Sequence, residues 1–124
     1  MRFITKQLRS FAHAFRGLKW AWSSQIHIRI HAIAALLVCA AGLAVGVSAG
    51  EWIMLLLCIG CVFSAELFNT AIEVFANKLH PNMDSEIGKV KDLAAAAVLI
   101  CALTSALVGF IIFIPYIKAG LAPF

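Results

Sequence analysis

The sequence is poor in charge: charged residues make up 13% of its 124 positions, and residues 1–31 contain no acidic residue. Soluble domains usually carry about 25% charged and roughly 45–50% apolar residues, whereas 63% of this chain is hydrophobic. A chain this short has too little interior to hide so much apolar surface from water. The composition therefore excludes a soluble monomer, a disordered tail and a small disulfide-stabilised domain, and it predicts a membrane protein.

Several chemical signatures are absent as well. The chain has no G-x-x-x-x-G-K-[ST] phosphate-binding loop, no protein-kinase signature and no nucleophilic serine or cysteine beside a histidine. A nucleotide would therefore have to be bound by residues outside these motifs. Cys58 and Cys61 have CxxC spacing, but they lie in an apolar run without the strand–helix setting of a redox motif. We interpret them as small packing residues.

The first segment, over residues ~3–23, has the pattern of an amphipathic helix. Its apolar residues recur in steps of three and four, at Ile4, Leu8, Phe11, Phe15, Leu18 and Trp22. Basic residues follow the same rhythm on the opposite face, at Arg2, Lys6, Arg9, His13 and Arg16. Such a helix lies in the membrane interface, where its basic face suits the anionic cytoplasmic leaflet. Because membrane spans follow it, we expect no nucleic-acid partner.

Three apolar segments, over residues ~29–49, ~52–76 and ~85–117, predict three transmembrane helices. About 20 residues cross a bilayer core of ~30 Å, so each segment is long enough. We find no internal repeat. The chain is therefore expected to be a single domain over residues 1–124, an all-α membrane protein with one surface helix and three transmembrane helices.

The breaks between these helices have recognisable signals. Ser23-Ser24-Gln25 offers a break and a fresh helix start. We expect a short turn over Ser48–Glu51, and a second break at His80-Pro81-Asn82. Asp84 or Ser85 is the expected N-cap of the last helix.

The basic residues also predict the orientation in the membrane. With a cytoplasmic N-terminus, nine of the ten Lys and Arg residues lie inside and only Lys118 lies outside. The end of the second span, the loop over residues 77–90 and the junction over residues 25–29 would then share the cytoplasmic face. We expect the inner membrane of a bacterium, with the functional site at that face.

Glu66, Asn69 and Glu73 are the most informative residues. Offsets of three and seven put them on one helix face, and a carboxylate near the bilayer centre costs at least ~2.5–3.5 kcal/mol. At about 10 Å deeper than Glu73, Glu66 suits a general base acting on an alcohol. Glu73 suits a hard cation such as Mg²⁺, and Asn69 can orient either. The alternative is a packing role, with the carboxylates paired to Arg29 and Lys91.

Lys91 and Asp92 lie at the same expected height. A lysine at a helix N-terminus is a phosphate site, because the exposed backbone amides and the helix dipole add to its charge. The alternative for Lys91 is an interfacial anchor whose ammonium reaches the water.

Three sequence blocks resemble one family. Glu66-Leu67-Phe68-Asn69-Thr70-Ala71-Ile72-Glu73 is similar to the E-x-x-N-T-A-I-E motif of bacterial diacylglycerol kinases, a family that includes undecaprenol kinases. The block over residues 88–99, GKVKDLAAAAVL, resembles a second family block, and Arg29-Ile30-His31 resembles a third. The resemblance covers nearly the whole chain, in order. The third block and the ending over residues 109–115 are closer to the undecaprenol-kinase branch.

The resemblance implies a homotrimer whose active sites are shared between neighbours and which uses MgATP to phosphorylate a lipid hydroxyl, of undecaprenol or of diacylglycerol. It implies that Glu66 is the base, with Asn69 beside it in the catalytic site, and that Glu73 and the residue at position 25 bind the metal. The implied nucleotide-binding residues are Lys6, His13, Glu73, Asn82, Asp84, Lys91 and Asp92. The implied lipid-binding residues are Arg29, His31, Glu66 and Ala95.

The chain departs from the family pattern at three places. Gln25 stands where the family has a second metal-binding glutamate. Its amide can ligate through oxygen but brings no charge, which predicts weaker metal binding. Asn77 stands where the motif commonly ends in Asp, and Asn82-Met83-Asp84 replaces a more usual Glu-Tyr-His.

We therefore predict a membrane lipid kinase. One alternative is a small proton-coupled transporter in which Glu66 titrates, as intramembrane carboxylates often do. Another is a catalytically inactive kinase homologue, which the missing charge at Gln25 favours.

Overall fold

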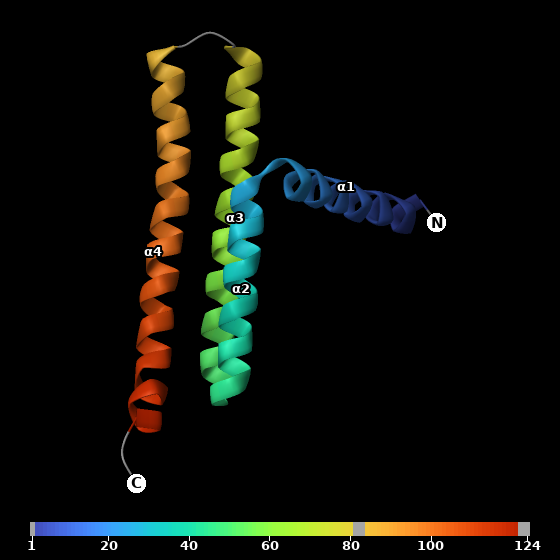
Figure 1. Ribbon diagram of the computed structural model, residues 1–124. Coiled ribbons are helices and arrows are strands. Elements are labelled where there is room, and N and C mark those ends of the chain that lie inside the picture. Colours follow the sequence, from blue (N-terminus) through green and yellow to red (C-terminus); the bar gives the residue numbers. More distant parts are fainter. Residues whose placement is uncertain (1, 81–83, 122–124) are drawn as a thin grey trace.

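The described part of the chain, residues 2–80 and 84–121, consists of four α-helices in a computed structural model (Figure 1). Helix α1 spans Arg2–Ser24, α2 spans Ile26–Val45, α3 spans Ala49–Leu79 and α4 spans Ser85–Leu121. The break at Gln25 and the helix end before His80 confirm two of the expected boundaries. Asn82, an expected nucleotide contact, lies outside the described residues.

Helices α2, α3 and α4 run side by side, whereas α1 runs across their direction and points away from them (Figure 1). The most extensive packing is between α3 and α4. Both of these helices continue past the level at which α1 joins α2, so the C-terminal end of α3 and the N-terminal end of α4 project beyond α1. The chain therefore has a three-helix part on one side of α1 and a two-helix part on the other.

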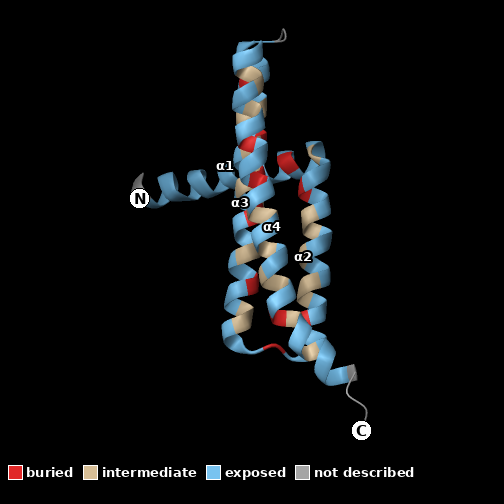
Figure 2. Cartoon of the chain, turned by 90° about the vertical axis from the view of Figure 1, so that its left-hand side faces the viewer, coloured by how far each residue is buried: buried red, intermediate tan, exposed pale blue. Residues whose placement is uncertain are grey.

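Helices α2, α3 and α4 are each long and apolar enough to cross a bilayer. Few of their residues are buried within the chain, and most of their surface faces outward (Figure 2). Such apolar surface is stable against lipid or another apolar partner, not against water. The architecture is thus that of a multi-pass membrane protein, as the sequence predicts.

The turn between α2 and α3 comes earlier than the sequence analysis places it. Gly46 adopts a left-handed conformation (φ 70°) that ends α2, a conformation that costs glycine little. Ser48 then caps α3: its side chain accepts a hydrogen bond from the Glu51 backbone N–H, while the Glu51 carboxylate accepts one from the Ser48 backbone N–H at 2.7 Å. The predicted turn over Ser48–Glu51 is wrong, because these residues form a capping box that begins a helix.

The same end of the molecule holds the buried hydrophobic cluster. Val47, Leu55 and Ile112 pack together there, and the Tyr116 hydroxyl donates to Glu51 Oε2 at 2.7 Å. This bond ties α4 to the start of α3. The other end of the α3–α4 pair is therefore the one left open for polar chemistry.

Asp84 is the N-cap of α4. Its Oδ1 accepts from the backbone N–H groups of Glu86 and Ile87, at 2.8 and 3.2 Å. These bonds, that from Ile87 first and that from Glu86 second, hold the pKa of Asp84 below its ordinary value. Hydrogen bonds to a carboxylate favour its charged form.

The cap predicts a pH-dependent stability. The folded-state pKa of Asp84 is lower than its unfolded value of about 3.9, so the ionised cap stabilises the fold above about pH 4 and its contribution is lost as the pH falls through the folded pKa. We expect Asp84→Ala to lower the thermal unfolding temperature at pH 7 and to differ less from the parent near pH 3. Asp84→Asn keeps a good cap without a titrating group, and should stay near the parent at pH 7. An equal deficit of Asp84→Ala at both pH values would contradict this role.

Candidate active site

A buried carboxylate–histidine pair lies at the level where α1 meets the other helices. Glu66 on α3 is only 5% exposed, and its Oε1 accepts a hydrogen bond from Nε2 of His31 on α2 at 3.2 Å. A buried carboxylate without a partner is costly, so His31 stabilises the position of Glu66. No hydrogen bond to Glu66 Oε2 occurs within the described residues, which leaves that oxygen available to a ligand.

Both residues were expected in the site, but not as a pair. Arg29, an expected packing partner of the carboxylates, is exposed, and Glu66 is paired with His31 instead. The two residues are 35 positions apart, and the available signal was their similar expected height on neighbouring antiparallel spans. Asn69, one turn further along α3, is half-buried.

A second polar group lies further along the same helix, in the part of α3 and α4 that projects beyond α1. The Lys91 ammonium donates to Asn77 Oδ1 at 3.1 Å and lies 4.0 Å from Glu73 Oε1. Both Glu73 and Lys91 are partly exposed, with side-chain exposures of 46% and 37%. The pairing joins Asn77, where the chain departs from the family pattern, to the lysine of the second block. A cation between two acceptors is well placed to meet an anionic ligand from the aqueous side.

The setting of Lys91 corrects one expectation. Lys91 does not open a helix, because α4 begins at Ser85 and Lys91 lies almost two turns inside it. The backbone amides at that position are bonded within the helix, and the dipole effect falls off within the first turn. Any phosphate recognition by Lys91 therefore rests on its ammonium and its neighbours Asn77 and Glu73.

The remaining predicted site residues are distributed around these two groups. Asp92 and Ala95 are exposed on α4, and Asp84 is engaged as the helix cap. Gln25 is half-buried at the α1–α2 junction, where its side chain makes no capping hydrogen bond. The amide oxygen of Gln25 is therefore not used to cap α2.

Lys6 and His13 lie on α1, away from the site on their own α3. Both are exposed, and Arg16 contacts the His13 ring. Lys6 precedes Gln25 by 19 residues, which in a helix is about 28 Å. Because α1 points away from the other helices (Figure 1), these two side chains do not converge with Glu73 and Lys91 of the same chain.

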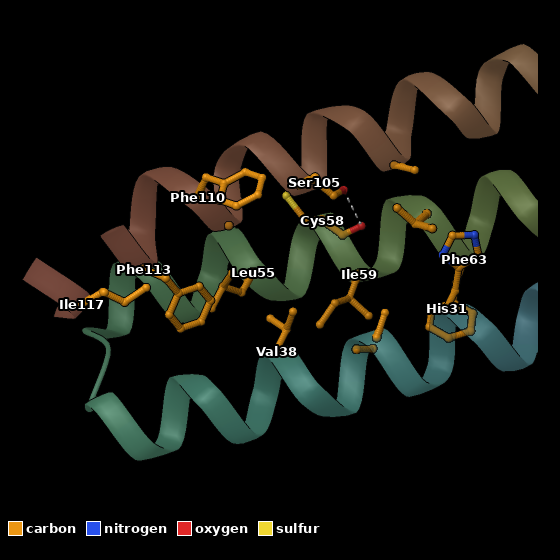
Figure 3. Close-up of a pocket in the computed structure, with 16 residues that line it drawn as sticks. His31, Val38, Leu55, Cys58, Ile59, Phe63, Ser105, Phe110, Phe113 and Ile117 are labelled. Atoms are coloured by element: carbon orange, nitrogen blue, oxygen red, sulfur yellow. Dashed lines mark hydrogen bonds between the residues drawn. The ribbon is translucent and has the colours of Figure 1, made fainter. Parts of the chain in front are cut away.

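An apolar pocket of about 450 Å³ begins at His31, the partner of Glu66, and follows the spans (Figure 3). His31 and Phe63 line one end and Ile117 the other. The only hydrogen bond drawn between its lining residues joins the Ser105 hydroxyl to the Cys58 carbonyl, at 3.4 Å. The pocket offers a hydrocarbon chain a surface of matching polarity, with His31 as the polar group at its end.

A spanning helix with a buried carboxylate, placed next to a lysine–amide–carboxylate group and an apolar pocket, is typical of membrane enzymes that act on amphiphilic substrates. Comparison with known proteins identifies the family. The sequence pattern of the family described as prokaryotic diacylglycerol kinase matches residues 12–113. The chain belongs to this family, a family of lipid kinases.

The relatives include proteins named for two lipid substrates. The chain is 37% identical, over 90% of its length and 91% of the relative's, to an undecaprenol kinase of Bacillus subtilis (strain 168). It is 32% identical to a diacylglycerol kinase of Synechocystis, over 87% of this chain and 62% of that one, and 27% identical to the diacylglycerol kinase of Escherichia coli K12, over 78% and 80%. The resemblance found in the sequence motifs is confirmed.

The carboxylate–histidine pair predicts a measurable coupling. His31→Leu leaves Glu66 buried without its partner, whereas the same change in a Glu66→Leu background removes no hydrogen bond. We therefore expect His31→Leu to destabilise the parent more than the Glu66→Leu variant, by about 1 kcal/mol. Chemical unfolding of the four proteins in detergent measures this difference. Additive effects of the two substitutions would show that the pair does not stabilise the fold.

Proposed function

We propose that the chain transfers the γ-phosphate of ATP to the hydroxyl of a membrane lipid, undecaprenol or diacylglycerol, at the cytoplasmic face of a bacterial inner membrane. The observation that carries the proposal is the buried Glu66, with one carboxylate oxygen held by His31 and the other without a partner in the described residues. His31, which is bonded to Glu66, lines one end of an apolar pocket, and this supports a hydrophobic alcohol as the acceptor.

The proposed orientation rests on charge and on shape. α1 carries basic residues along one face and apolar residues along the other, and it runs across the spans; this supports an amphipathic helix lying in the interface plane. The projecting ends of α3 and α4 then reach into the cytosol with Glu73, Asn77 and Lys91. The distribution of Lys and Arg favours the same orientation.

In this arrangement Glu66 accepts the proton of the lipid hydroxyl, and the hydroxyl oxygen attacks the γ-phosphorus as ADP leaves. General bases contribute typically 10²–10⁴-fold to a rate. Glu73 lies about 10 Å nearer the cytosol on the same helix face, which leaves space between the two carboxylates for the phosphate chain. Asn69 lies between them and is proposed to orient the reacting groups.

Lys91 is proposed to bind nucleotide phosphates, with Asp92 beside it on α4. The Lys91 ammonium already lies between an amide oxygen and a carboxylate, so it is held at the aqueous end of the site. Asp84 stays a proposed nucleotide contact only through Oδ2, because Oδ1 serves the helix cap. Asn82 stays a proposed contact from the sequence resemblance.

The oxygen donors of this chain fit magnesium if the phosphates of the nucleotide supply the remaining ligands. The described residues contain no cluster of three or more His, Cys, Asp or Glu side chains that could hold a metal ion, and Mg²⁺ is commonly bound by one or two carboxylates together with phosphates and waters. Glu73 supplies the carboxylate, and the Gln25 amide is proposed as a second oxygen donor. When bound, the ion would neutralise charge on the β- and γ-phosphates.

We further propose a homotrimer with shared active sites. The spans leave most of their apolar surface uncovered within one chain, and Lys6 and His13 are exposed on the helix that runs away from the bundle. A neighbouring subunit is the partner for which α1 is placed to supply these two side chains. Ala95 and Arg29, both exposed, are proposed to contact the lipid.

The kinase proposal is tested through Glu66. Glu66→Gln keeps the size of the side chain and removes the base, so we expect transfer of label from γ-labelled ATP to either lipid in mixed micelles to fall by about 10²–10⁴-fold. Unchanged oligomer size in detergent is the control for folding. Full activity of the variant would contradict the proposal, and pH-driven, ATP-independent substrate movement in vesicles would favour a proton-coupled transporter.

Gln25 generates a separate prediction. Gln25→Glu adds a charged oxygen donor to the proposed metal site, so the magnesium concentration that gives half-maximal transfer should fall, by several fold. Gln25→Ala, which removes the donor, should raise it. An identical magnesium dependence of all three proteins would show that Gln25 does not bind the metal. This outcome would leave the conclusion of the Glu66 experiment unaffected. ATP binding without turnover in the parent, with turnover in Gln25→Glu, would identify an inactive homologue.

A further inference from the structure

Thr70 is one of only two buried polar residues among the described residues; the other is Glu66. It is 5% exposed, and its hydroxyl makes no hydrogen bond within the described part of the chain. Every fully enclosed side-chain nitrogen or oxygen in that part has a partner, so the Thr70 hydroxyl is not enclosed. It therefore borders accessible space, from which a ligand or water can satisfy it.

The free space is a hollow of about 460 Å³ between α1 and α3. Small residues of α1, namely Ala14, Gly17 and Ala21, face Leu67, Thr70 and Ala71 of α3. Leu18 and Trp20 complete the lining. Thr70 is thus the only hydroxyl in a wall that is otherwise apolar apart from the indole N–H, which fits the polar end of an amphiphile better than a charged ligand.

Thr70 lies one helical turn from Glu66, on the same face of α3. The separation along the axis is about 6 Å, and residues four apart are neighbours on a helix surface. A small polar group that reaches the free oxygen of Glu66 also comes within reach of the Thr70 hydroxyl. The hollow is also lined by α1, the helix that we place in the membrane interface. The polar ends of lipids lie at this depth.

We propose that Thr70 is a lipid-binding residue: its hydroxyl hydrogen-bonds to an oxygen at the polar end of the acceptor lipid, and this end of the lipid lies in the hollow between α1 and α3 while its alcohol faces Glu66. The inference rests on the proposed kinase function and adds a specificity-determining residue to it. Two lipid oxygens have the required chemistry, the alcohol itself and the ester carbonyl of a glyceride. They are distinguished by comparing a lipid that has both with a prenol that has only the first.

The kinetic test uses a pair of variants. Thr70→Val keeps the branched shape and removes the hydroxyl, whereas Thr70→Ser keeps the hydroxyl. We expect Thr70→Val to lower kcat/KM for the lipid about fivefold, chiefly through KM, the loss that one neutral hydrogen bond accounts for. The KM for ATP should not change, and Thr70→Ser should restore most of the loss. Gly17→Leu, which fills the hollow from α1 at a position with no atom within 4 Å of an added Cβ, should also raise the lipid KM.

The two lipids separate the two oxygens. A loss with both diacylglycerol and undecaprenol supports a bond to the alcohol, and a loss with diacylglycerol alone supports a bond to the ester carbonyl. Wild-type kinetics of Thr70→Val with both lipids, in a variant that keeps its oligomer size, would overturn the proposal.

A binding measurement keeps this inference separate from the kinase activity. Trp20 lines the hollow, so a full-length variant with Trp22→Phe and Trp52→Phe reports on it through one indole. A diacylglycerol with brominated chains should quench Trp20 fluorescence more than a brominated phospholipid at equal concentration, and Thr70→Val should reduce the excess quenching. Equal quenching by the two lipids would overturn the hollow as a lipid site, whether or not the protein transfers phosphate.

Discussion

The site depends on one constraint: a carboxylate buried in an apolar bundle needs a partner, and among the described residues Glu66 has His31 alone. The 3.2 Å bond joins α2 to α3 at the level of α1, and it fixes one oxygen of Glu66 while the other has no partner in the described part of the chain. A general base has to be held in place and yet have a free acceptor. A single histidine on a neighbouring span meets both conditions, whereas an arginine would engage both oxygens.

The second constraint is length. α3 and α4 have 31 and 37 residues, more than the ~20 needed to cross a bilayer core, and their extra turns extend beyond α1. Glu66 and Thr70 stay at the depth where α1 packs, while Glu73 and Lys91 lie on the extension. In the proposed orientation one continuous helix links a lipid-facing region to an aqueous one, as the proposed transfer from a water-soluble nucleotide to a membrane alcohol requires.

The sequence predicted the helical class, the number of helices and most of their ends, because hydropathy and helix periodicity are local signals. It misplaced the turn between α2 and α3, where the Ser48–Glu51 capping box looks like a polar loop until its two reciprocal bonds are seen. The polar residues of the site were also found, since Glu66 and Glu73 are exceptional in an apolar span. Lys91 was named as a partner of the carboxylates and lies 4.0 Å from Glu73. The His31–Glu66 and Lys91–Asn77 bonds were not foreseen, because they join residues far apart in the chain and depend on helix rotation, which hydropathy does not encode.

Hydrogen bonding divides the polar residues of this chain into two groups. Glu51 and Asp84 are occupied in helix caps, and Lys91 is shared between Asn77 and Glu73; these groups are satisfied within one chain and stabilise the ends of α3 and α4. Glu66 and Thr70 differ, since each is buried and each keeps an acceptor or donor without a partner in the described residues. Since every fully enclosed polar side-chain atom in the described residues has a partner, these two unpaired atoms border space that water or a ligand can reach. Thr70 lines the hollow between α1 and α3, and Glu66 is its neighbour on the same face of α3. The stretch of α3 from Glu66 to Thr70 therefore combines burial of the two residues with polar atoms that stay available to a ligand, as the proposed lipid site requires.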